Sequence, residues 1–166
     1  TRHLVLSVNV SARELKQSDL VDNAKKVLER TGINPSALSL EITESILLDN
    51  IEEFIVKMKE LKEIGIAFAL DDFGTGYSSL SHLKRLPINE LKIDKSFVRD
   101  LGVDKNDEAI VRTIIQMGKT LGMDVVAEGV ETQIHRAMLE RYGCHNYQGY
   151  LFGKPTALEN FERELD

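Results

Sequence analysis

Ala67-Phe68-Ala69-Leu70-Asp71-Asp72 is a short apolar run that ends in two adjacent carboxylates. Leu38-Ser39-Leu40-Glu41 and Val125-Val126-Ala127-Glu128 repeat this pattern of apolar residues closed by an acid. Short apolar runs bounded by polar residues are typical of buried parallel strands, whose carboxyl ends meet at one edge of a sheet. The pattern therefore predicts an α/β fold with several acidic side chains gathered at that edge.

Acids gathered in this way need compensation, because isolated buried charges are strongly destabilising. A divalent cation is the simplest compensating group. The available ligands are oxygens, and the four histidines show no metal-ligand spacing. We therefore expect Mg2+ or Mn2+ rather than zinc or copper.

Six strand candidates, separated by helical patterns, predict β/α units on a parallel sheet. They are residues 4–9, 38–43, 66–71, 90–93, 124–127 and 146–151. The polar residues at their ends are Asn9, Glu41, Asp71, Lys92, Glu128 and Gln148. These lie 20 to 36 residues apart, which leaves room for a strand, a crossover and the next strand.

The architecture that best suits these units is a TIM-type (β/α)8 barrel, in which strand ends carry the active site. Such a barrel has eight units and about 250 residues, so we expect about six units here and about two before Thr1. An open Rossmann-like sheet is the alternative. It is less favoured because its Gly-x-Gly-x-x-Gly motif is absent and the polar strand ends are too many for one switch point.

The composition predicts a globular chain: 166 residues with 42% hydrophobic content form one domain or part of one. The net charge of −6 argues against a nucleic-acid polymer as partner. No apolar run approaches the roughly 20 residues that cross a bilayer, so we expect no membrane contact by this domain. The single Cys144 favours the reducing cytoplasm, free or as the cytoplasmic part of a membrane-bound parent.

Two further features carry chemistry. Lys92 lies on the alternating run Leu91-Lys92-Ile93-Asp94 and should project toward the acids, where it can hold a water or stabilise charge on a phosphoryl oxygen. The stretch Phe73-Gly74-Thr75-Gly76-Tyr77-Ser78 has glycines that permit tight turns and close backbone approach. We expect it to be a functional loop beside a ligand or a dimer neighbour.

Together these segments resemble the EAL domains, which are cyclic di-GMP phosphodiesterases of bacterial signalling proteins. The matching segments, in the family's order, are Ser7-Val8-Asn9-Val10-Ser11, Glu41-Ile42-Thr43-Glu44-Ser45, Asp71 to Ser78, Leu91-Lys92-Ile93-Asp94, Ala127-Glu128-Gly129-Val130-Glu131-Thr132 and Gln148-Gly149-Tyr150-Leu151-Phe152. The resemblance spans nearly the whole chain. It implies that residues 1–166 are the C-terminal two thirds to three quarters of an EAL barrel.

The resemblance also implies the reaction and the residue roles. The reaction is hydrolysis of cyclic di-GMP to linear pGpG by a water that two Mg2+ or Mn2+ ions activate. The implied metal ligands are Asn9, Glu41, Asp71 and Asp72, with Glu128 reaching the metals directly or through water. The other implied roles are Lys92 and Gln148 at the attacking water, Glu44 as anchor of the glycine loop, and Glu131 as support for the Glu128 turn. The loop from Phe73 to Ser78 would couple metal binding to dimerisation, and sensory or diguanylate cyclase domains can be fused in the parent.

The chain departs from the family at its naming motif, because it contains no Glu-Ala-Leu strand. Glu108-Ala109-Ile110 is no substitute, since it follows Asn106-Asp107 and begins a helical pattern; its glutamate should lie in a solvated first turn. We expect an active intact parent but weak or absent activity from these residues alone, because missing strands would expose parallel edges.

Several alternatives stay open at the level of sequence. The domain can be a catalytically inactive module that binds cyclic di-GMP without cleaving it. An aldolase with Lys92 as Schiff-base nucleophile is disfavoured, because neighbouring acids raise a lysine pKa. Among single residues, Asn9 can be an Asx-turn residue, Gln148 a buried amide and Lys92 a structural ion-pair partner, while Glu44 and Glu131 can simply fix loops.

Overall fold

The computed structural model describes residues 4–44, 51–76 and 80–165. Their six strands form one sheet in chain order, and every neighbouring pair is parallel. The strands are β1 (Leu6–Asn9), β2 (Leu38–Thr43), β3 (Ala67–Phe73), β4 (Glu90–Ile93), β5 (Asp124–Ala127) and β6 (Asn146–Tyr147). This order confirms the prediction of six β/α units forming part of a barrel.

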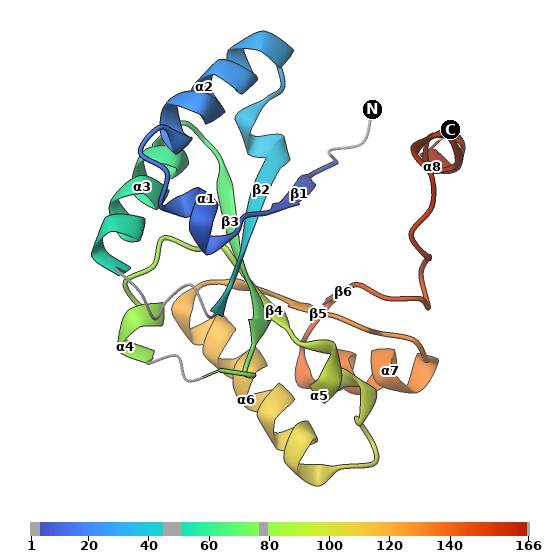
Figure 1. Cartoon of the computed structure of the whole chain (residues 1–166). Coiled ribbons are helices and arrows are strands. Elements are labelled where there is room, and N and C mark those ends of the chain that lie inside the picture. Colours follow the sequence, from blue (N-terminus) through green and yellow to red (C-terminus); the bar gives the residue numbers. More distant parts are fainter. Residues whose placement is uncertain (1–3, 45–50, 77–79, 166) are drawn as a thin grey trace.

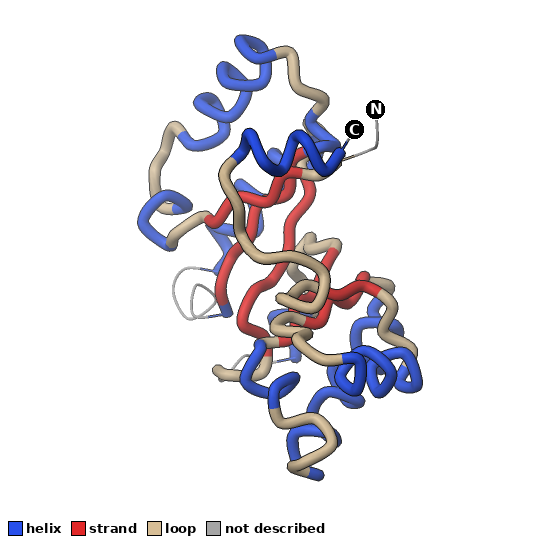
Figure 2. Tube along the Cα trace, turned by 90° about the vertical axis from the view of Figure 1, so that its right-hand side faces the viewer, coloured by secondary structure: helices blue, strands red, loops and turns tan. Residues whose placement is uncertain are grey.

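Helices follow the strands and lie outside the curved sheet (Figures 1 and 2). They are α1 (Ala12–Leu15), α2 (Leu20–Thr31), the 3-10 turn η1 (Pro35–Ala37), α3 (Ile51–Glu63), α4 (Leu80–Leu83), α5 (Lys95–Arg99), α6 (Lys105–Leu121), α7 (Gln133–Tyr142) and α8 (Leu158–Leu165). Helix α8 stands apart from the others at the end of the segment that follows β6 (Figure 1). Among the described segments, the helices are too short or too polar to span a lipid bilayer.

The two faces of the sheet have different chemistry because side chains alternate along each strand. One face packs under the helices and carries the buried core residues Leu40, Ile42, Phe68, Leu70, Leu91, Ile93, Val125 and Ala127. The concave face carries Ser39, Glu41, Ala69, Asp71, Glu90 and Lys92 instead. The fold thus places Glu41, Asp71 and Glu90 on the face that a closed barrel would enclose.

Glycines end three of the longer helices. Gly32, Gly122 and Gly143 adopt left-handed conformations after α2, α6 and α7. Helix α6 begins after Asp104, whose side chain accepts a hydrogen bond from the Asn106 amide. Glu108 therefore belongs to a first helical turn, as expected. It is not simply solvated, however, because it accepts a hydrogen bond of 2.6 Å from the Tyr142 hydroxyl.

Four strand boundaries differ from the sequence prediction: β1 begins at Leu6 instead of residue 4, β3 begins at Ala67 instead of residue 66, and the ends of β3 and β6 also differ. Strand β3 continues past Asp71 to Phe73, while β6 ends at Tyr147 instead of residue 151. After β6 the chain turns, although the Gln148 amide still donates to the Ala127 carbonyl at 2.8 Å. A single apolar run cannot show where such pairing stops, because the stop depends on the neighbouring strand.

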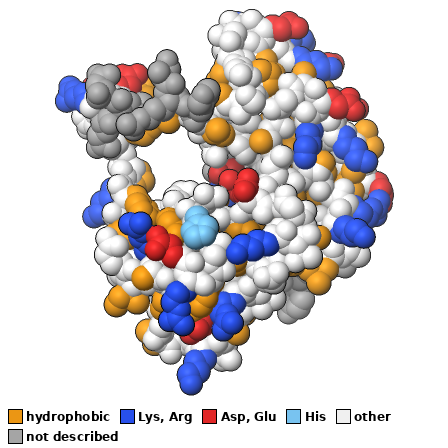
Figure 3. All heavy atoms as spheres, turned by 180° about the vertical axis from the view of Figure 1, so that it is seen from behind, with side chains coloured by type: hydrophobic (Ala, Val, Ile, Leu, Met, Phe, Trp, Pro, Cys, Tyr) orange, Lys and Arg blue, Asp and Glu red, His pale blue; other side chains and the backbone are white. Residues whose placement is uncertain are grey.

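Seen from behind, the molecule has a wide opening between the C-terminal segment that follows β6 and the rest of the chain, with acidic side chains at its edge (Figure 3). Strands β1 and β6 are the edges of the described sheet, so the opening lies where a closed barrel would continue.

Candidate active site

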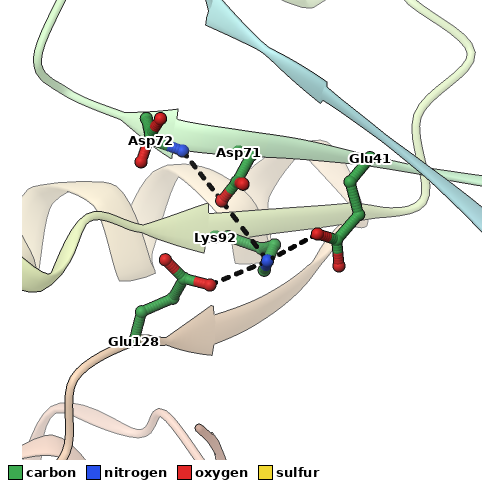
Figure 4. Close-up of polar contacts among 5 residues, drawn as sticks. All are labelled: Glu41, Asp71, Asp72, Lys92 and Glu128. Atoms are coloured by element: carbon green, nitrogen blue, oxygen red, sulfur yellow. Dashed lines mark hydrogen bonds and ion pairs between the residues drawn. The ribbon is translucent and has the colours of Figure 1, made fainter. Parts of the chain in front are cut away.

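Lys92 is the centre of the charged cluster (Figure 4). Its Nζ atom lies 2.9 Å from Glu41 Oε2, 3.3 Å from Asp71 Oδ1 and 2.7 Å from Glu128 Oε1. The lysine is only 4% exposed and Glu41 only 8%. Residues from β2, β3, β4 and the end of β5 thus meet at one point.

The acids decide the protonation of Lys92. Burial opposes the charged ammonium, but the hydrogen bonds to Glu128 and Glu41 and the charge of Asp71 outweigh it and raise the lysine pKa above its ordinary value. A Schiff-base lysine needs the opposite shift, which argues against the aldolase hypothesis. Burial raises the pKa of Glu128, while Lys92 counteracts the increase.

A bulge brings the Asp71 and Asp72 carboxylates toward the same side. The register of β3 against β4 shifts between Leu70 and Phe73, and Asp72 has a positive φ of 54°. Strict alternation would separate two adjacent side chains, so this local distortion is what unites them. Backbone in this region is unfavourable for a residue with a side chain and is concentrated at functional sites.

The converging oxygens fit a hard divalent cation. Asp71, Asp72 and Glu128 each offer a carboxylate oxygen, and these atoms lie within 4.8 Å of one another. Burial and the negative charges of Asp71 and Asp94 raise the pKa of Asp72, which is the behaviour of a carboxylate short of positive charge. Oxygen-only ligand sets of this kind suit Mg2+, Mn2+ or Ca2+.

Glu44 anchors the glycine loop through hydrogen bonds. The Glu44 Oε2 atom accepts hydrogen bonds from the amides of Gly74 at 3.2 Å and Gly76 at 3.0 Å, and Thr75 Oγ1 donates to the Asp72 carbonyl. A Cβ atom on Gly76 would lie 2.8 Å from the Glu44 carboxyl carbon, so a larger residue there would displace the Glu44 carboxylate. Phe73, at the start of the loop, is buried, while Tyr77 and Ser78 lie outside the described residues.

Three other expected site residues, Asn9, Gln148 and Glu131, are exposed. Asn9 is in register with Glu41 but is exposed on the edge strand β1. Gln148 is exposed and lines a cavity of about 360 Å³ with Tyr150 and Lys154. Glu131, three residues after Glu128, is exposed.

Sequence reasoning assigned no role to two acids that the structure places beside the cluster. Asp94 is 9% exposed and accepts hydrogen bonds from the amide and hydroxyl of Ser96 at the start of α5. Burial acts to raise its pKa, but the bonds from Ser96 and Asp72 lower it overall. Glu90 shares the concave face with Lys92. Its position two residues before Lys92 was a readable signal, since alternate strand residues share a face.

Comparison with known proteins identifies the fold and its lineage. The model of the EAL domain family matches residues 1–155. The chain belongs to the EAL domain family. Its six-stranded parallel sheet is therefore part of an EAL barrel.

Two curated relatives of this EAL chain come from Pseudomonas aeruginosa. The bifunctional diguanylate cyclase/cyclic di-GMP phosphodiesterase MucR is 44% identical over 154 residues, which are 93% of this chain and 22% of MucR. The cyclic di-GMP phosphodiesterase NbdA is 44% identical over 163 residues, 96% of this chain and 21% of NbdA. The chain thus spans about a fifth of the length of these relatives.

Solved structures of EAL proteins agree with the fold. The MucR phosphodiesterase, solved as a c-di-GMP complex, has a TM-score of 0.90 at 43% identity; the match covers 95% of this chain and 64% of that one. Klebsiella pneumoniae BlrP1, solved as a manganese/cy-diGMP complex, has a TM-score of 0.84 at 34% identity, with coverage of 91% and 39%.

Proposed function

We propose that this chain is the larger part of a metal-dependent phosphodiesterase domain that hydrolyses cyclic di-GMP to linear pGpG. The observation that carries the proposal is the convergence of Glu41, Asp71 and Glu128 on Lys92 at the carboxyl ends of four strands. The EAL family membership and the names of MucR and NbdA support the substrate. We propose residues 1–166 as the C-terminal two thirds to three quarters of the barrel.

The proposed cofactors are two Mg2+ or Mn2+ ions held by Asn9, Glu41, Asp71 and Asp72, with Glu128 as direct or water-mediated ligand. When bound, divalent ions lower the pKa of a water and offset the charge that develops on the phosphoryl oxygens. The manganese complex of BlrP1 supports this assignment, as do the converging oxygens of Asp71, Asp72 and Glu128.

The chain's own residues supply position and electric field. Lys92 remains protonated because the acids raise its pKa, so its fixed positive charge can orient the attacking water or stabilise a phosphoryl oxygen. Gln148 is proposed to hold the water or a nearby ligand. Glu44 holds the loop in place through the Gly74 and Gly76 amides.

The same proposal covers partners and setting. The loop beginning at Phe73 is proposed to link the site to a homodimer contact, and Glu131 to support the turn after Glu128. MucR carries a diguanylate cyclase activity as well, which supports fused signalling domains in the parent protein. We infer a cytoplasmic location from the single buried thiol of Cys144.

A second candidate is a module that binds cyclic di-GMP without cleaving it. The observation that favours it is the absence of a Glu-Ala-Leu sequence from the 166 residues, together with the exposure of Asn9 on the edge strand. Under this second candidate, the chain binds the nucleotide, and hydrolysis would require the strands that complete the barrel.

The test measures pGpG release with Mn2+ from two polypeptides: the chain itself, and a chimera in which the unmatched part of the MucR phosphodiesterase domain completes the barrel. We expect turnover from the chimera, weak or no turnover from the chain, and loss of turnover in both on Asp71→Asn. Equal turnover by the Asp71→Asn chimera would overturn the mechanism. Tight cyclic di-GMP binding by an inert chimera would favour the binding module.

A further inference from the structure

Strand β4 directs two charged side chains to the concave face. Leu91 and Ile93 are fully buried on the helix side, so alternation places Glu90 and Lys92 together on the opposite side. Lys92 reaches the three acids at the carboxyl ends of the strands. Glu90 lies two residues earlier on the same strand and therefore farther from the carboxyl ends of the strands.

The neighbours of Glu90 leave it facing mainly like charge. In the sheet register, Ala69 and Asp124 lie on either side of Glu90, and Ala69 also pairs with Glu41. Because Ala69 contributes only a methyl group, nothing larger separates the Glu41 and Glu90 side chains across the roughly 10 Å of two strand spacings. The charged groups whose fields act on the pKa of Glu90 are Lys92, Glu41, Asp124 and Glu128.

Among these four groups, only Lys92 carries the charge opposite to that of Glu90. Burial raises the pKa of Glu90. The negative charges of Glu41, Asp124 and Glu128 raise it further, and only the positive charge of Lys92 lowers it. A carboxylate retained in such surroundings stabilises an ammonium on the same face of the strand. The convergent oxygens of the candidate metal cluster come from Asp71, Asp72 and Glu128, not from Glu90.

We propose that Glu90 is a positioning residue for the phosphodiesterase reaction, supplying the counter-charge that holds the Lys92 ammonium in place when Glu41, Asp71 and Glu128 share their charge with divalent cations. This inference rests on the proposed function of the site. All three ion-pair partners of Lys92 are proposed cation ligands, so their attraction for the ammonium weakens as cations bind. Glu90 is the acid on the same strand that stays available to Lys92.

The test compares Glu90→Gln with the control Asp124→Asn. Each variant removes one negative charge, but Asp124, which pairs with Glu90 in the sheet register, is exposed. Mn2+ binding to the chain is measured by calorimetry. We expect Glu90→Gln to raise the Mn2+ Kd about threefold to tenfold, because an ammonium without its counter-charge competes for the cation's ligands, and Asp124→Asn to change it less than about twofold. Glu90→Asp, which keeps the charge, should stay within about twofold of the wild type.

Turnover by the barrel-completing chimera is the second readout. At saturating Mn2+, Glu90→Gln should lower kcat about tenfold with little change in KM for cyclic di-GMP, because Lys92 acts on the reacting phosphodiester after binding. Wild-type values for Glu90→Gln, or equal effects of Glu90→Gln and Asp124→Asn, would overturn this inference alone. A wild-type protein that neither binds Mn2+ nor hydrolyses cyclic di-GMP would overturn the proposed function and this inference with it.

Discussion

Replacing Lys92 with Met tests how much of the stability of the fold depends on charge compensation at the site. Met keeps the length and apolar contacts of the side chain but removes the ammonium. Glu41, Asp71 and Glu128 would then lose the cation that lies 2.7 to 3.3 Å from their oxygens. Removing one partner of a buried ion pair costs about 3–5 kcal/mol.

We expect the lower end, about 3 kcal/mol, because the Asp71 and Glu128 side chains retain 15% and 16% exposure. With an m value of about 2 kcal/mol/M, the urea midpoint should fall by about 1.5 M at pH 7. The assay is urea unfolding of the metal-free chain followed by far-ultraviolet circular dichroism.

The deficit should shrink on acidification. Burial already raises the pKa of Glu128 and only Lys92 holds it down, so the variant's folded state binds protons more tightly than its unfolded state. Stability of the variant therefore falls as pH rises through the raised pKa and recovers toward about pH 4, where unfolded carboxylates also begin to protonate.

Lys57→Met is the matched control. Lys57 donates to the carbonyls of Leu15 and Gln17 and pairs with the half-exposed Glu53, so its loss leaves no buried charge behind. We expect it to cost about 1 kcal/mol with little pH dependence. A Lys92→Met protein as stable as the control, or equally destabilised at pH 7 and pH 4, would refute the reasoning.

Two further predictions concern the loop and the core. Glu44→Ala should lower the free energy of unfolding by about 1 kcal/mol and speed hydrogen exchange at the Gly74 and Gly76 amides. The control Glu131→Ala, at an exposed position, should leave exchange at those amides unchanged. Unaltered exchange in the Glu44 variant would show that the two hydrogen bonds do not hold the loop. Phe54→Ala removes a ring on the buried side of α3 that is 1% exposed, and should lower the free energy of unfolding by about 3–5 kcal/mol in thermal or urea unfolding. Val56→Ala, on the exposed side of the same helix, should change it by less than about 0.5 kcal/mol. Similar values for the two variants would mean that α3 does not pack as described.

Local pattern was sufficient for most of the fold. The bounds of β2, β4 and β5 match the apolar runs, because a buried parallel strand needs apolar residues on its packed face and its length is set by where they end. The helix ends at Gly32, Gly122 and Gly143 have an equally local cause, since each glycine adopts a left-handed conformation that other residues avoid.

The candidate site was only partly readable. Acids at the ends of buried strands predicted a common edge, and Glu41, Asp71, Lys92 and Glu128 do meet there. The union of Asp71 with Asp72 needed a bulge, whose position depends on how β3 pairs with β4. Asp94 drew no assignment because its contacts with Ser96 and Asp72 depend on how the chain turns after β4.

The amino-acid order by itself determined the parallel α/β units, the order of the strand-end acids and the family to which the chain belongs, because these follow from periodicity and motif spacing along one chain. Only the tertiary structure decided that one ammonium pairs with three carboxylates and that Glu44 accepts hydrogen bonds from the Gly74 and Gly76 amides. Such relations depend on register and distance between segments far apart in the chain, and electrostatic interaction depends on distance in space.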